Sequence, residues 1–257
     1  MLAFARQLAL DVGAMLRRGQ AGSLEIALKG ASDVVTDMDR AAEARILEAL
    51  RERFPDHAVL AEESGAHGAA DYRWIVDPLD GTLNYAHRWP HWAVSIALEH
   101  RGSVVLGVVY APVLGELFWA ERGRGAFRDG ERLQVSRVDR FGDALLNFGS
   151  LALRPDLPLA AQPAGRLLGA AFKTRQTGSC TLDLCWLAAG RTDACMQGNT
   201  TAWDIAAGKL ILEEAGGRAS GPTGEEFALG ERVFVASNGT LHAELLQVLS
   251  WPPEVHS

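Results

Sequence analysis

The feature that most constrains the fold is a change in hydrophobic period near Trp92. Before this residue, apolar residues recur at helical spacing. After it, three segments rich in β-branched and aromatic residues follow one another with only short turns between them, which is the pattern of an antiparallel meander. These segments are residues 92–98, 104–110 and 116–120, and a further strand is expected at residues 132–135.

Helices and strands are expected on either side of this meander. Leu8, Val12 and Leu16 lie at helical spacing before Gly19, and a second helix is expected over residues 39–54. The second half of the chain alternates instead, with strands at 144–148, 193–197 and 232–236 and helices at 179–189, 202–215 and 241–249. The chain therefore mixes α+β and α/β character, and layers of sheet and helix are expected.

Length, charge and hydropathy limit the class of protein. The 257 residues fit one domain, 1–257, made of two fused halves at about 1–137 and 138–257, with the longest linker at 154–165. The 25 Lys and Arg against 32 Asp and Glu give a net charge of −7, so no basic surface for nucleic acid is expected. No apolar run is long enough for a membrane span and no secretory leader is visible, so we expect a cytoplasmic protein.

Cysteine and histidine do not predict a metal site. The three cysteines, Cys180, Cys185 and Cys195, contain no CxxC pair, so neither a disulfide framework nor a zinc–thiolate site is expected. His87 and His91 are four residues apart, but Pro90 lies between them and a strand follows, so packing is the preferred interpretation. Packing is also expected for the tryptophans near the acidic segments, Trp74, Trp89, Trp92 and Trp203.

The sharpest local feature is an acidic turn, DPLDGTLNY at residues 77–85, which follows an apolar run. A proline and a glycine favour a tight turn that leaves Asp80 and Thr82 at its mouth. Asp77 and Asp80 can converge on a hard cation through oxygen, and the N–H groups of Gly81 and Thr82 can hold an anion because Gly81 has no side chain. The turn therefore predicts adjoining cation and anion sites, although such carboxylates can also simply cap backbone N–H groups.

Three further acidic clusters also lie next to a predicted helix or an apolar run: DVVTDMD at residues 33–39, EESG at 62–65 and TAWD at 201–204. Each also has a purely structural interpretation. Asp39 is a suitable helix N-cap, Glu62 and Glu63 could be a solvated pair, and Thr201 with Asp204 resembles a capping box. The four clusters together favour one shared site.

These clusters carry a resemblance to a known family. DPLDGTLNY at 77–85, AEESG at 61–65, KGASDVVTDMD at 29–39 and WDIAAGKLILEEAGG at 203–217 resemble, in the same order, the motifs of the inositol monophosphatase family of Mg²⁺-dependent, Li⁺-sensitive sugar-phosphate phosphatases. The resemblance extends over nearly the whole chain. It implies the layered αβαβα sandwich of the sugar phosphatase fold, with an antiparallel meander sheet in the first half and a mixed sheet in the second. It also implies a homodimer.

The resemblance also implies the residues of the site. Two or three Mg²⁺ per subunit would be held by Glu62, Asp77, the carbonyl of Leu79, Asp80 and Asp204. Thr82 and Asp39 would position or deprotonate the attacking water, with Glu62 as a third catalytic residue. The substrate would contact Asp80, Gly81, Thr82, Cys180, Gln197 and Asp204. Carboxylate and carbonyl donors suit Mg²⁺, and two such ions bridged by Asp77 would activate water on one side and stabilise the leaving oxygen on the other.

One position departs from the inositol-specific pattern. Gln197 stands where those members carry a glutamate that binds a ring hydroxyl, and an amide there loses the charge-assisted bond. Inositol 1-phosphate is the first expectation for the substrate, with histidinol phosphate, 3′-phosphoadenosine phosphate and fructose 1,6-bisphosphate as alternatives. A regulatory or binding protein that retains the fold is the alternative from another class. Glycoside hydrolysis by a carboxylate pair is disfavoured by the anion site and by the excess of acids.

Overall fold

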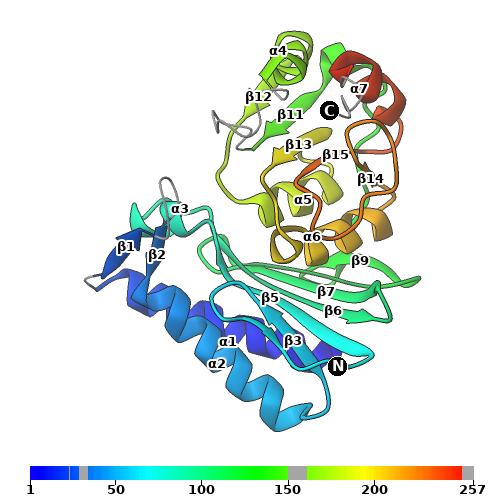
Figure 1. Cartoon of the computed structure of the whole chain (residues 1–257). Helices are drawn as coiled ribbons and strands as arrows, with labels where there is room; N and C mark the ends of the chain where they lie inside the picture. Colours follow the sequence, from blue (N-terminus) through cyan, green and yellow to red (C-terminus); the bar gives the residue numbers. More distant parts are fainter. Residues whose placement is uncertain (23, 29–33, 150–160, 251–257) are drawn as a thin grey trace, which may run out of the picture.

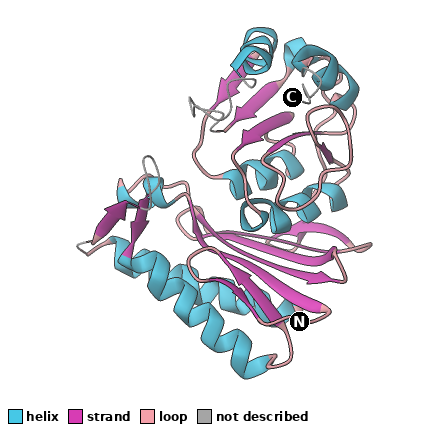
Figure 2. Cartoon of the chain, viewed as in Figure 1, coloured by secondary structure: helices cyan, strands magenta, loops and turns pink. Residues whose placement is uncertain are grey.

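The chain folds into five alternating layers of helix and sheet (Figures 1 and 2). The computed structural model describes residues 1–22, 24–28, 34–149 and 161–250. From one outer face to the other, the layers are α1 (Leu2–Gln20) with α2 (Asp37–Arg53), an eight-stranded sheet, α5 (Cys180–Ala188) with α6 (Ala202–Glu214), a five-stranded sheet, and α4 (Ala161–Ala170) with α7 (His242–Leu249). This arrangement confirms the predicted αβαβα sandwich.

The larger sheet contains the predicted meander. Its order is β10-β9-β8-β7-β6-β5-β3-β4, and every pair is antiparallel except β3 with β5. The strands are β3 (Ala58–Ala61), β4 (Gly65–His67), β5 (Tyr72–Asp80), β6 (Ala93–His100), β7 (Ser103–Ala111), β8 (Glu116–Glu121), β9 (Gly125–Arg128) and β10 (Glu131–Arg132). A two-stranded ribbon, β1 (Ile26–Leu28) with β2 (Val34–Thr36), precedes it.

The strand expected at residues 132–135 is wrong in its extent. β10 ends at Arg132; the N–H of Leu133 makes one further bond to the carbonyl of Ala126 in β9, at 2.8 Å, and the chain then leaves the sheet edge. The N–H of Val135 donates to the carbonyl of Ala215 at 3.2 Å, just beyond the end of α6, instead of to a neighbouring strand. The apolar residues of this segment contact the central helical layer. Their spacing in the sequence cannot be told apart from that of a strand.

The smaller sheet is mixed, as predicted, in the order β12-β11-β13-β15-β14. β11 is parallel to both of its neighbours, whereas β15 is antiparallel to both of its own. The strands are β11 (Leu145–Phe148), β12 (Lys173–Arg175), β13 (Ala194–Gly198), β14 (Arg218–Ser220) and β15 (Val233–Ser237), and a 3-10 turn, η1 (Phe141–Asp143), precedes them. Of the linker expected at 154–165, residues 161–165 are helical in α4, and 154–160 lie outside the described residues.

The two central helices pack closely on the larger sheet. A Cβ on Gly107 of β7 would lie 2.8 Å from the carbonyl oxygen of Ala207 in α6, so α6 lies directly on this strand. Helices on both faces bury β5 and β6 almost continuously. Trp74 and Trp92 are buried as predicted, but Trp89 is 62% exposed, so the expectation that it packs is wrong.

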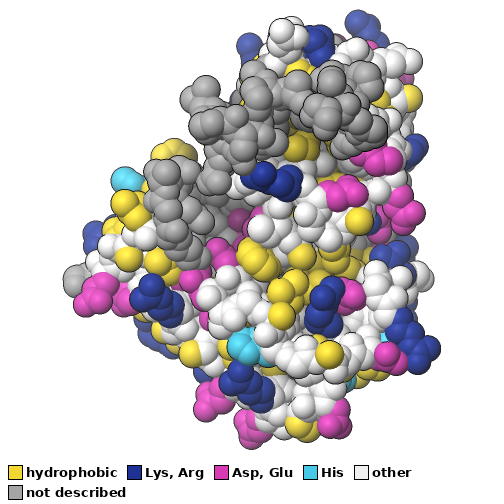
Figure 3. Space-filling model, viewed as in Figure 1, with side chains coloured by type: hydrophobic (Ala, Val, Ile, Leu, Met, Phe, Trp, Pro, Cys, Tyr) yellow, Lys and Arg dark blue, Asp and Glu magenta, His cyan; other side chains and the backbone are white. Residues whose placement is uncertain are grey.

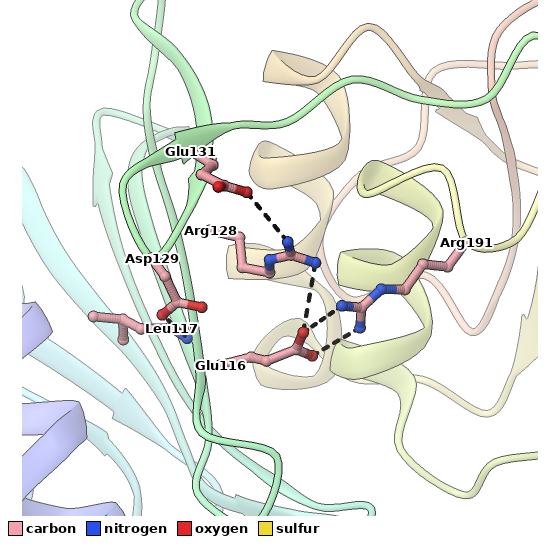
Figure 4. A network of polar contacts seen from close by, with 6 residues as sticks. All are labelled: Glu116, Leu117, Arg128, Asp129, Glu131 and Arg191. Atoms are coloured by element: carbon pink, nitrogen blue, oxygen red, sulfur yellow. Dashed lines mark hydrogen bonds and ion pairs between the residues drawn. The ribbon is translucent and has the colours of Figure 1, made fainter.

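A polar network ties this helical layer to the edge of the larger sheet (Figure 4). Both terminal nitrogens of Arg191, which follows α5, donate to the carboxylate of Glu116 at the start of β8. Arg128 of β9 lies 3.5 Å from the same carboxylate. The end of α5 is thereby fixed to the first sheet.

On the face in Figure 3, acidic and basic side chains are interspersed over the described residues.

The described part of the chain offers no helix with the length and apolarity that a membrane span needs.

The outer helical layer contains a buried histidine. His242 begins α7, with its Nε2 2.9 Å from Ser220 Oγ and its Nδ1 3.1 Å from Ser237 Oγ. Burial, together with the positive charge of Arg218, lowers the pKa of His242 to about 4.

Acidification should therefore destabilise the fold through His242. The unfolded chain binds this proton near pH 6.5, above the folded value, so the stabilisation is complete above pH 6.5 and is lost as the pH falls toward 4. The loss should reach about 2–3 kcal/mol. Urea unfolding should show a difference in free energy between wild type and His242→Gln that shrinks between about pH 7.5 and about pH 4.5. A difference independent of pH would contradict this prediction.

Candidate metal and phosphate site

The acidic turn is built on an irregularity at the end of β5. Asp77 pairs with Ser95 of β6, whereas Asp80 pairs with Ala93, so three steps along β5 match two along β6. This bulge removes Leu79 from the ladder, and its N–H donates to Asp77 Oδ1 at 2.9 Å instead. The bulge therefore places Asp77, the Leu79 carbonyl and Asp80 within one short turn.

Thr82 connects this turn to the first helix layer. Its Oγ1 lies 2.8 Å from Asp39 Oδ1 and 3.1 Å from the carbonyl oxygen of Leu79. Asp39 is fully buried, and its Oδ2 accepts bonds from the N–H and hydroxyl of Thr36 at 2.8 and 2.6 Å. Asp39 is therefore not the N-cap: Thr36 caps α2, and Asp39 closes a capping box from the third helical position.

The second half of the chain holds Asp80. The hydroxyl of Ser179 and the N–H of Thr181, the latter at 2.9 Å, both donate to Asp80 Oδ2. Ser179 is also the N-cap of α5, because its Oγ accepts a bond from Leu182 N. Asp80 is thus bound to the start of a helix about a hundred residues further along the chain.

Asp204 lies at the start of the neighbouring helix, α6. Its Oδ2 accepts bonds from the N–H and hydroxyl of Thr201 at 2.7 and 3.0 Å, which is the predicted capping box. The hydroxyl of Thr181 donates to the carbonyl of Asp204 at 3.0 Å. The N-termini of α5 and α6 are therefore joined beside Asp80.

The carboxylates raise one another's pKa. Burial raises the pKa of Asp77 well above its ordinary value, and repulsion from Glu62, Asp80 and Asp204 raises it further. Burial also raises the pKa of Asp80, opposed by the hydrogen bonds from the second half. For Asp204, burial brings the pKa to about 7, with Asp80 and Glu62 adding to the shift. Among the described residues, no Lys or Arg forms a salt bridge with Asp77, Asp80 or Asp204.

This donor set fits a divalent cation. Buried negative charges need a counter-charge, and the available donors are carboxylate and carbonyl oxygens, which Mg²⁺ prefers. Within the described ranges, no group of three or more His, Cys, Asp or Glu side chains is arranged so that it could hold a metal ion as it stands. The fit therefore depends on charge and donor type. Glu62 follows β3, the parallel neighbour of β5, which explains how it comes close to Asp77.

Gly81 leaves space at the mouth of the turn. It adopts a left-handed φ of +89° and caps α3 (Thr82–Ala86). A Cβ on Gly81 would lie 3.0 Å from the carbonyl oxygen of His91 and 3.3 Å from that of Gly178. The first N–H groups of a helix have no acceptor within it, so those of Gly81 and Thr82 remain suited to an anion.

Two expected substrate contacts lie in the second half. Cys180 is the first residue of α5 and is partly buried, and burial with the charges of Asp204 and Asp80 raises the pKa of its thiol. Gln197 of β13 is buried, and its Nε2 donates to Asp183 Oδ2 at 2.7 Å. The amide nitrogen of Gln197 is therefore already engaged. Residues 29–33 of the KGASDVVTDMD motif lie outside the described residues.

Several polar residues near the site escape the sequence analysis. Thr181 and Asp183 lie inside a predicted helix, where nothing distinguishes them from ordinary helical positions. Ser179 begins the predicted helix at 179–189; it has the residue type of an N-cap and matches the pattern of the resembled family, and these are the two available signals. Its bond to Asp80 joins segments 99 residues apart and has no local pattern.

The five layers and the buried oxygen donors define a class of layered α/β protein whose acidic centre suits divalent cations. The model of the inositol monophosphatase family matches residues 1–251. An inositol-1-monophosphatase of Mesorhizobium japonicum is 39% identical over 251 residues, covering 96% of this chain and 94% of the relative. The Nus factor SuhB of Pseudomonas aeruginosa is 42% identical over 229 residues, covering 86% and 84% respectively.

A solved structure with a related sequence has the same fold as this chain. The crystal structure of the extragenic suppressor protein suhB from Bartonella henselae matches with a TM-score of 0.92 at 36% identity, covering 96% of this chain and 97% of that one. The chain therefore belongs to the inositol monophosphatase family, which is a family of phosphatases.

Substitution of Gly81 should destabilise the protein more than substitution of an unhindered glycine. Gly115, with φ of +70° and nothing within 4 Å of an added Cβ, is the matched control. Gly115→Ala should cost only the left-handed strain, about 1–2 kcal/mol. Gly81→Ala should cost about 1–3 kcal/mol more because its Cβ meets two carbonyl oxygens. Urea unfolding of both variants tests this, and equal costs would show that the tight packing at Gly81 is unimportant.

Proposed function

We propose that this protein is a Mg²⁺-dependent phosphomonoesterase that acts on a small polyol or sugar phosphate. The observation that carries the proposal is the buried carboxylate cluster around Asp77, whose pKa is raised by burial and by repulsion from Glu62, Asp80 and Asp204. Glu62, Asp77 and the Leu79 carbonyl would hold one Mg²⁺, and Asp77, Asp80 and Asp204 would hold another. Bound Mg²⁺ would stabilise negative charge on the phosphate and the leaving oxygen and would lower the pKa of water.

The protein's own groups would orient the reactants. Thr82 donates its hydroxyl proton to Asp39, which leaves its oxygen free to accept a proton from the attacking water. Asp39 can hold this role because Thr36 fixes its other oxygen. The N–H groups of Gly81 and Thr82 would bind a phosphate oxygen. A water molecule, not a side chain, would then attack phosphorus.

Inositol 1-phosphate remains the first proposed substrate, because relatives that cover nearly the whole chain carry the name inositol-1-monophosphatase. Histidinol phosphate, 3′-phosphoadenosine phosphate and fructose 1,6-bisphosphate remain alternatives. We also retain a cytoplasmic homodimer, sensitive to Li⁺, as part of the proposal. The three free cysteines support a reducing compartment.

A second candidate function is action with a macromolecular partner. It is favoured by relatives at 38–42% identity that are named Nus factor SuhB. Such a role would depend on a surface and not on the carboxylates, and it could coexist with phosphatase activity. It would add a macromolecular partner to the expected small-molecule substrate and homodimer.

Asp80→Asn should abolish most phosphate release. The substitution preserves shape but removes one charge of the buried cluster, so turnover should fall by about two orders of magnitude or more. Asp71→Asn is the control, because Asp71 is exposed and makes only a surface ion pair with Arg101. Phosphate release from a panel of inositol, sugar, histidinol and nucleotide phosphates is measured with Mg²⁺ and with EDTA. Full activity in EDTA, or in Asp80→Asn, would refute the phosphatase proposal.

The same two variants separate the two candidate functions. They are expressed in a Pseudomonas aeruginosa strain that lacks its own SuhB. Rescue by Asp71→Asn but not by Asp80→Asn would assign the cellular role to the phosphatase site. Equal rescue by both variants would assign it to a surface independent of that site.

Gln197→Glu should not by itself improve activity toward inositol 1-phosphate. Burial raises the pKa of Asp183 to about 7, and a glutamate at 197 would replace the amide donor by a second acidic group. Gln197→Glu combined with Asp183→Asn restores a donor opposite the new carboxylate. The double variant should lower KM for inositol 1-phosphate by about tenfold through a charge-assisted bond. An unchanged KM in the double variant, or an equal gain in the single one, would refute this.

A further inference from the structure

Asn84 connects the two halves of the site by hydrogen bonds. It lies in α3, two residues after Thr82, and its Nδ2 donates to two backbone carbonyls at once. One belongs to His91, at 2.7 Å, in the segment that leads into β6. The other belongs to Thr177, at 2.8 Å, in the segment that leads into α5. Asn84 therefore uses both amide hydrogens to join segments that lie far apart in the sequence.

The contact is closely packed on both sides. Gly178 has φ of +81°, and a Cβ on it would lie 3.0 Å from Asn84 Nδ2. The carbonyl of His91 that accepts a bond from Asn84 is also the nearest atom to a Cβ on Gly81. Gly178 thus leaves the space that the Asn84 amide occupies, and Gly81 leaves space for the carbonyl that accepts one of its bonds. A longer side chain at position 84 would not fit, and a shorter one would not reach both carbonyls.

The segment that Asn84 holds is the one that binds Asp80. Thr177 lies two residues before Ser179, which donates to Asp80 Oδ2, and four before Thr181, whose N–H donates to the same oxygen. The hydroxyl of Thr177 also donates to Asp183 Oδ1 at 2.7 Å. A displacement of this segment would therefore disturb the groups that orient Asp80.

We propose that Asn84 is a positioning residue that keeps residues 177–181 against the acidic turn and thereby fixes the Asp80 carboxylate for cation binding. The inference rests on the proposed function only in assigning Mg²⁺ to this site. The Asn84 amide donates to the carbonyls of His91 and Thr177, neither of which is a proposed Mg²⁺ ligand. It acts through Thr177, by keeping two separately built parts of the site in contact.

The test compares two asparagines that each make two hydrogen bonds through Nδ2, Asn84, which is partly buried, and Asn238, which is buried. Asn238 also uses its Nδ2 for two bonds across about a hundred residues, to Ser136 Oγ at 3.0 Å and to the Val138 carbonyl at 2.7 Å, but it lies after β15. Asn84→Asp and Asn238→Asp each replace donors by a carboxylate that faces the same acceptors. Both should lower the free energy of unfolding, so stability alone does not distinguish them.

The distinguishing measurement is Mg²⁺ binding by the intact protein without substrate, followed by calorimetry. Asn84→Asp should weaken Mg²⁺ binding by about tenfold or more, whereas Asn238→Asp should leave the Kd unchanged. Hydrogen exchange of the Thr181 amide in the metal-free protein should be faster in Asn84→Asp only. If Asn84→Asp does not fold, Asn84→Ser, which keeps one donor, should show a smaller shift in the same direction.

Three results would overturn the proposal: an unchanged Mg²⁺ Kd in the Asn84 variants, an equal loss in Asn238→Asp, or no Mg²⁺ binding by the wild type. A wild type that binds Mg²⁺ but releases no phosphate would contradict the proposed function alone. In that case the difference between the two asparagine variants would still decide the role of Asn84.

Discussion

Mutual repulsion among buried carboxylates is the constraint on which the rest of this structure depends. Asp77 and Asp80 are buried and Asp204 is partly buried; Asp80 and Asp204 raise the pKa of Asp77, and Asp80 also raises the pKa of Asp204. Such a group of charges is costly in a protein interior unless fixed hydrogen bonds or bound cations compensate it. Three features hold these carboxylates where a cation could neutralise their charge. They are the bulge in β5, the N-termini of the helices on either side, and the close approach of α6 to β7.

In this protein, the hydrogen bonds that cap helices also orient the carboxylates of the site. Asp39 and Asp204 each close a capping box with a threonine three residues earlier, and in both the bonds converge on Oδ2. Asp80 repeats the pattern with donors from another helix start. One oxygen of each carboxylate is thereby fixed and the other is left for a second partner. For Asp39 that partner is Thr82. The structural and functional interpretations of these clusters are therefore not alternatives.

Most of the layered fold could be predicted from the sequence because hydrophobic period, glycines and prolines mark elements locally. The meander, the alternating second half and the acidic segments all have such local signals. Contacts between distant segments have none. The bonds from Ser179 to Asp80 and from Asn84 to Thr177, the exposure of Trp89 and the pairing of Gln197 with Asp183 follow from how layers stack. The strand expected at 132–135 fails for the same reason, since its apolar residues face another layer and not a neighbouring strand.

The distance in sequence between Asp80 and its donors has a consequence for how the protein is made. Thr181 leaves the ribosome 101 residues after Asp80, and Asp204 later still. Until then the nascent first sheet lacks both the helices that cover its inner face and the hydrogen bonds that orient its acidic turn. Contacts of such long range form late in folding. The site must therefore be among the last parts of the molecule to assemble, and a truncated chain that ends before α6 cannot contain it.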